Sequence, residues 1–138
     1  MEAVRQSPGP YFFVAEAVLI YLTEQQVKLA LAQIAANFPN ATIAFDSSPL
    51  NAIRHGNKDH ERQKFDARFT WACEDPAEIE RWKIGLRLVE SRSMLDIPGP
   101  LRSRLSLPPR AVLRILLKFR PRIANICRLN LFAVQSDA

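Results

Sequence analysis

Glycine is scarce in this 138-residue chain, which contains only four, at positions 9, 56, 85 and 99. No two of them lie close enough to form a G-x-G turn, the feature that lets a phosphate or a dinucleotide approach a strand end closely. The sequence therefore holds no glycine-rich nucleotide cradle.

Cysteine and long apolar runs are also lacking. The two cysteines, Cys73 and Cys127, lie far apart, cannot form a metal site alone, and are not expected to pair in a reducing compartment. No stretch approaches the roughly 20 apolar residues that a membrane span needs. Residues 1–8 contain no apolar signal region, so we expect a cytoplasmic protein that does not contact a membrane.

Apolar residues make up 48% of the chain and charged residues 24%, as in an ordinary folded domain. Residues 1–80 contain 7 Lys+Arg and 11 Asp+Glu, a net charge of −4, whereas residues 81–138 contain 12 and 3, a net charge of +9. A solvated basic face is one interpretation, and an anionic partner is the other. Nucleic acid is not expected, because no known binding module or exposed aromatic pattern accompanies the charge.

The first half of the chain predicts a βαβ unit. The apolar run 12–15 predicts a fully buried strand. Thr23 and Gln26 form a capping box for a helix that reaches about Phe38, and residues 42–46 form a second short strand. Because the connections are short, the two strands should be parallel.

The second half predicts further alternation of helices and strands, which makes the fold class α/β. The expected elements are a loop with a helix within 47–69, a helix from Pro76 to Trp82 capped by Asp75, a strand over 86–93, an amphipathic helix from Pro108 to Pro121, and a strand over 126–134.

Two acidic residues, Glu16 and Asp46, end the first two expected strands. Ligands bind at the carboxyl ends of strands in open α/β sheets, and a carboxylate on a buried strand is costly unless it is paired or binds something. Glu16 is therefore the first candidate, with capping of the following turn as its structural alternative. For Asp46, contact with substrate competes with an Asx-type turn involving Ser47 and Ser48.

The remaining candidates carry weaker signals. Tyr21 can wall a substrate pocket or anchor the turn by apolar contact. His55 and His60 match no standard metal-ligand spacing, so we expect no metal and a solvated charged helix instead. Trp71 and Trp82 are expected in the core.

Four segments together resemble one family. These are Ala15-Glu-Ala-Val-Leu-Ile-Tyr-Leu22, Ala44-Phe-Asp46, Trp71-Ala-Cys-Glu-Asp-Pro76 and Arg128-Leu-Asn-Leu-Phe-Ala133. The chain resembles the leucine carboxyl methyltransferase family, which includes the tetracenomycin-type polyketide O-methyltransferases. Ala17 stands where the family's E-G-V-L-x-Y-L motif has glycine. The resemblance covers nearly the whole chain but only the second half of a complete member.

The resemblance implies a class I S-adenosylmethionine-dependent methyltransferase, with residues 1–138 as a single partial domain. The chain would supply strands four to seven of a Rossmann-like sheet, a parallel βαβ unit followed by an antiparallel edge pair. Glu16 would face the amino-acid end of S-adenosylmethionine, and the methyl group would pass to a carboxylate or hydroxyl oxygen of a small-molecule substrate. No residue is assigned as a general base.

The same resemblance leaves strand 12–15 without its usual neighbour. An apolar unpaired edge invites pairing with another chain. The chain alone is therefore expected to be inactive or partner-dependent. The alternatives are a non-enzymatic module that forms a homodimer or binds a separate N-terminal half, and a basic fragment that binds anions or nucleic acid.

Overall fold

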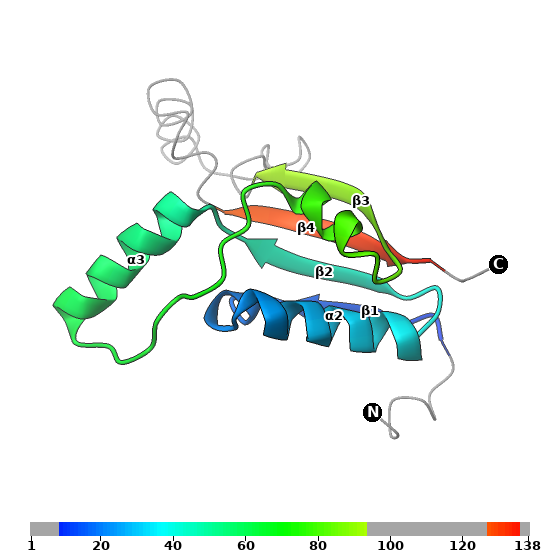
Figure 1. The fold of residues 1–138 in the computed structure, drawn as a ribbon, viewed down its shortest axis with the longest axis horizontal. Coiled ribbons are helices and arrows are strands. Elements are labelled where there is room, and N and C mark those ends of the chain that lie inside the picture. The colour runs from blue at the N-terminus through cyan, green and yellow to red at the C-terminus, as the bar shows by residue number, and fades with distance from the viewer. Residues whose placement is uncertain (1–8, 94–126, 136–138) are drawn as a thin grey trace, which may run out of the picture.

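The computed structural model describes residues 9–93 and 127–135, which include one four-stranded sheet (Figure 1). The strands are β1 (Phe12–Ala15), β2 (Thr42–Ser47), β3 (Leu86–Ser93) and β4 (Arg128–Val134), in the spatial order β1-β2-β4-β3. β1 and β2 are parallel, and β4 runs antiparallel to both β2 and β3. The predicted α/β fold, a parallel βαβ unit followed by an antiparallel edge pair, is confirmed. The helix predicted from Pro108 to Pro121 lies outside the described residues.

The helices of the described chain are α2 (Glu24–Asn37), α3 (Leu50–Gln63) and the 3-10 helices η1 (Leu19–Tyr21) and η2 (Pro76–Trp82). The capping box of α2 is confirmed, since Gln26 N–H donates to Thr23 Oγ1 and Thr23 N–H donates to Gln26 Oε1. Asp75 caps η2 as predicted, although the helix is 3-10 rather than α. None of these helices is long and apolar enough to cross a membrane.

The core lies on one face of the sheet, beneath α2 and η2 (Figure 1). Val27 and Leu31 of α2 are buried against it. Phe45 and Phe132, from neighbouring strands, stack with ring centroids 5.2 Å apart. Trp71 is buried beside Phe45, and Trp82 packs partly buried at the margin, so both tryptophans belong to the core as predicted.

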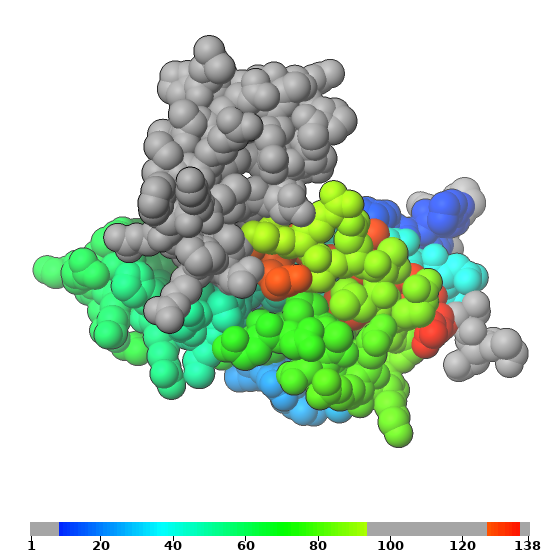
Figure 2. Space-filling view, turned by 90° about the horizontal axis from the view of Figure 1, so that it is seen from above, coloured from blue at the N-terminus to red at the C-terminus, as the bar shows by residue number. Residues whose placement is uncertain are grey.

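The prediction that strand 12–15 is fully buried is wrong. β1 is an edge strand, and Phe12 and Val14 are 62% and 67% exposed. They lie on the side opposite α2 and η2, together with Leu129 of β4. We call the surface formed by Phe12, Val14 and Leu129 the open face. In Figure 2 the side chains of β3 mark the other edge of the sheet, with the η2 region beside them.

α3 leaves the end of β2 and projects from the body of the molecule (Figure 1). It has a single buried residue, Ile53, which fits the predicted solvated charged helix. The chain then returns along α3, where the Asn57 amide exchanges two hydrogen bonds of 2.8 and 2.9 Å with the Phe69 backbone. Thr70 N–H next donates to Ile20 C=O of η1, so the returning segment is tied to the turn that follows β1.

Candidate functional site

Glu16 and Asp46 come together at the carboxyl ends of β1 and β2. The register pairs Ala15 with Phe45, and the two acids are the next residues of these parallel neighbours. Asp46 Oδ1 accepts a 2.7 Å hydrogen bond from Ala17 N–H. The turn after β1 is therefore fixed to the end of β2.

The backbone of Ala17 is left-handed, with φ of 53°. This conformation brings a Cβ close to the following carbonyl oxygen and costs about 1–2 kcal/mol in residues other than glycine. The replacement of the motif's glycine by Ala17 is visible in the sequence, but the strained conformation is not. The hydrogen bond to Asp46 helps to hold the turn in this shape.

Glu16 is exposed, so the argument that its burial demands a partner is wrong. Within residues 9–93 and 127–135, its carboxylate makes no hydrogen bond or ion pair. Asp46 rather than Glu16 accepts the turn's N–H, and it does so in place of the Asx-type turn with Ser47 and Ser48. Glu16 thus presents a carboxylate to solvent at the strand ends.

Cys127, which sequence reasoning did not select, lies at the same place. Burial raises the pKa of its thiol, the charges of Asp46 and Glu16 raise the pKa further, and a hydrogen bond with Ser48 lowers it. The register, which pairs Asp46 with Leu129 and Ser47 with Arg128, places Cys127 at the end of the sheet where the two acids lie. We call Glu16, Asp46, Ser48 and Cys127 the strand-end cluster. No sequence signal pointed to Cys127, because its place depends on β4 lying beside β2.

Tyr21 packs against Phe69 of the segment that returns from α3, with ring centroids 5.2 Å apart. Tyr21 as a whole residue is still 43% exposed. The geometry agrees with the anchoring role, and the exposed part of the ring leaves room for contact with a ligand.

A chain of polar side chains crosses the sheet beneath the strand-end cluster. Arg128 Nε donates to Ser91 Oγ at 2.9 Å, Ser91 Oγ–H donates to Asn130 Oδ1 at 2.7 Å, and Asn130 Nδ2 donates to Ser47 Oγ at 2.8 Å. Asn130 and Ser47 are almost completely buried. Because each side chain forms a hydrogen bond with the next, this row of polar side chains fixes β2, β4 and β3 in register at this end of the sheet.

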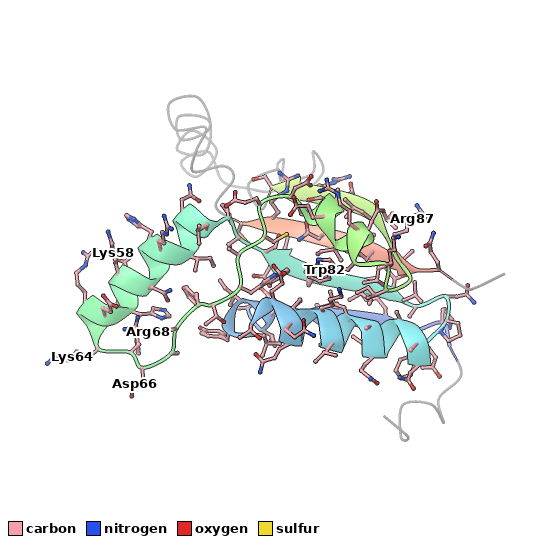
Figure 3. All side chains as sticks on the ribbon, in the orientation of Figure 1. Lys58, Lys64, Asp66, Arg68, Trp82 and Arg87 are labelled. Atoms are coloured by element: carbon pink, nitrogen blue, oxygen red, sulfur yellow. The ribbon has the colours of Figure 1, made fainter. Side chains whose placement is uncertain are left out.

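The two histidines lie on α3. His60 Nδ1 is 2.8 Å from the Ala67 carbonyl oxygen, and its ring packs against Phe69. In the described part of the chain, no group of three or more His, Cys, Asp or Glu side chains could hold a metal ion. Figure 3 shows Lys58, Lys64 and Asp66 pointing outward around the tip of this helix.

Comparison with solved structures yields a fold relative at low sequence identity. A DUF574 family protein from Streptomyces avermitilis superposes with a TM-score of 0.54 and 12% identity, covering 96% of this chain and 48% of its own. The N-methyltransferase NodS from Bradyrhizobium japonicum overlaps with a TM-score of 0.42 and 15% identity, over 94% of this chain and 55% of its own, which is too weak to bear on the fold.

The match with the DUF574 family protein shows a shared fold. The chain spans about half the length of the structures it matches. No protein-family model and no curated protein matches the sequence.

Proposed function

We propose that this chain is the C-terminal half of an S-adenosylmethionine-dependent O-methyltransferase of the leucine carboxyl methyltransferase type. The observation that carries the proposal is the strand-end cluster, in which Glu16 and Asp46 meet at the carboxyl ends of two parallel strands. The sheet order, a parallel pair followed by an antiparallel pair, supports it because the sequence resemblance implies the same arrangement.

The cluster fits a cationic group. Two carboxylates create a negative potential, and the exposed carboxylate of Glu16 can pair with the ammonium group of the cofactor through charge-assisted hydrogen bonds. S-adenosylmethionine, when bound, supplies an electrophilic methyl group. In this proposal the chain's own residues hold and orient the cofactor. Glu16 binds the amino-acid end of the cofactor, and Asp46 fixes the turn through Ala17.

Asp46 and Tyr21 remain the proposed substrate contacts. Asp46 uses Oδ1 for Ala17, so a substrate would meet Oδ2. Tyr21 would contribute the part of its ring that Phe69 leaves exposed. A hydroxyl acceptor would donate to Oδ2 of Asp46, whereas a carboxylate acceptor, which the charge of Asp46 repels, would lie against Tyr21 instead.

The experiment that tests this function is titration of the purified full chain with S-adenosylhomocysteine, followed through backbone amide NMR signals. We expect weak binding that shifts the signals of residues 15–18, and an at least tenfold loss of affinity in Glu16→Gln, about the effect of losing a charge-assisted hydrogen bond. Because the glycine-rich cradle is missing, the chain alone should show no methyl transfer with S-adenosylmethionine.

Asp66→Asn is the matched control. It makes the same change of charge at the outer end of the loop after α3, where Figure 3 shows Asp66 pointing away from the body. It should bind as the unaltered chain does. Equal affinity of Glu16→Gln and the unaltered chain would refute the role of Glu16, and measurable turnover by the chain alone would refute its incompleteness.

A non-enzymatic interaction module is the second candidate, favoured by the exposed side chains of edge strand β1. In this function the same edge would receive another chain, either a separate N-terminal half or a second copy. The two candidates are compatible, because an incomplete sheet is completed by a partner strand.

A further inference from the structure

The outer edge of β1 lacks three of the devices that normally protect an edge strand, although its length of only four residues is itself one of them. Natural edges are blunted by lysine, by proline or by a β-bulge. From Phe12 to Ala15 the strand is uncharged, contains no proline and pairs with β2 without a register shift. No residue in the described ranges pairs with its other side.

The backbone groups of the free edge belong to Phe12 and Val14. Thr42 N–H donates to Tyr11 C=O, which shows that residue 11 turns its backbone toward β2. In a parallel ladder alternate residues face the same neighbour, so residues 13 and 15 do likewise, and Phe12 and Val14 present N–H and C=O outward. Their side chains are also the exposed ones. The same two residues thus offer both hydrogen bonds and apolar surface.

We propose that β1 pairs antiparallel with β1 of a second copy of this chain, about a two-fold axis at Phe13. The axis places Phe12 opposite the partner subunit's Val14, and Val14 opposite the partner subunit's Phe12. Each of these two pairs exchanges two backbone hydrogen bonds, so four form in all. Each pair also sets an aromatic ring against a β-branched side chain, which is a favourable cross-strand contact.

A second copy is the occupant that this edge fits best, because the edge is complementary to itself. In the two-fold register Glu16 lies opposite the partner subunit's Pro10, so the two Glu16 carboxylates do not face each other. The exposed Phe12 and Val14 side chains of the two copies then form one apolar patch on the open side of an eight-stranded sheet. Since the paired segment is only four residues long, the dimer is a weak one that depends on concentration.

The test is sedimentation equilibrium of the full chain over about 10 µM to 1 mM, a range chosen for a weak complex. The average mass should rise toward twice that of the monomer. Val14→Pro removes an outward N–H without removing a bond to β2, and should weaken association at least tenfold. Val14→Thr is the matched control, because it keeps the N–H and the strand propensity, and it should still associate.

Hydrogen exchange of the unaltered chain gives a second measurement that does not depend on folding of the proline variant. The Phe12 and Val14 amides should exchange more slowly as concentration rises, while the rate at Phe13, whose N–H faces β2, should not depend on concentration. A monomer at every concentration would overturn the proposal. So would a dimer that survives Val14→Pro, or exchange at Phe12 and Val14 that does not slow.

Discussion

At the scale of single residues, Ala17 shows that a small residue other than glycine can occupy a backbone conformation that favours glycine. Its φ of 53° is a value that glycine adopts freely and alanine does not. A glycine at this position would meet the geometry of the turn without strain, and Asp46 holds the turn from the neighbouring strand. The sequence identified both residues as notable, but their connection became visible only when β1 and β2 were placed side by side.

Ala17→Gly should stabilise the chain by about 0.5–1 kcal/mol, the relief of left-handed strain less the entropy of an added glycine. Urea unfolding followed by circular dichroism would measure the change. Ala36→Gly, on the exposed side of α2, should instead destabilise by about 1 kcal/mol. Equal losses at both positions would show that the turn does not strain Ala17.

The buried thiol of Cys73 should make the stability of the chain depend on pH in the alkaline range. Burial raises the pKa of its thiol from 9.0 to about 11, although a hydrogen bond with Ser47 acts in the opposite direction. Between these values the unfolded thiol ionises and the folded thiol does not, so the free energy of unfolding should fall as pH rises from 9 to 11. Urea titrations across this range should show a steeper fall for the unaltered chain than for Cys73→Ala. Parallel curves would contradict the prediction.

At the scale of elements, α3 and the segment that returns along it approach each other closely at Gly56. A Cβ at Gly56 would lie 2.5 Å from Phe69 Cε2, so glycine lets the returning segment approach the helix. Alanine normally stabilises a helix interior relative to glycine, but here overpacking should outweigh that gain.

Gly56→Ala should therefore destabilise the chain by about 1–2 kcal/mol, whereas the same change in a Phe69→Ala background should stabilise it by about 0.5 kcal/mol. Thermal or urea unfolding of the four proteins gives the coupling directly. Additive effects would mean that the helix and the returning segment do not constrain each other at this point.

Local signals predicted most elements well. The apolar runs located β1 and β2, the alternating pattern located β3, and the capping box located the start of α2, because these elements depend on neighbouring residues. The helix within 47–69 could be placed only loosely, since Ile53 is its one buried residue. Burial of β1 was predicted wrongly because a short apolar run cannot distinguish an edge strand with one open side from a strand covered on both sides.

At the scale of the whole molecule, the described chain is a sheet with α2 and η2 on one face and the open face, with its exposed apolar side chains, on the other. The sequence suggested an antiparallel final pair, but the insertion of β4 between β2 and β3 follows from pairing across long separations. That insertion also brings Cys127 to Asp46, which explains why the strand-end cluster could be predicted only in part.

The polar chain from Arg128 through Ser91 and Asn130 to Ser47 has a consequence for how this protein can change over generations. Losing one member leaves a buried donor or acceptor without a hydrogen-bond partner. Replacing the buried members together by apolar residues leaves no buried polar group unsatisfied. Single substitutions in this set are therefore costly to stability, although the joint replacement of the buried members by apolar residues is not. Descendants of this sequence should therefore keep Ser47 and Asn130 as a pair or exchange them as a pair, whereas the partly buried Ser91 and Arg128 can change at less cost.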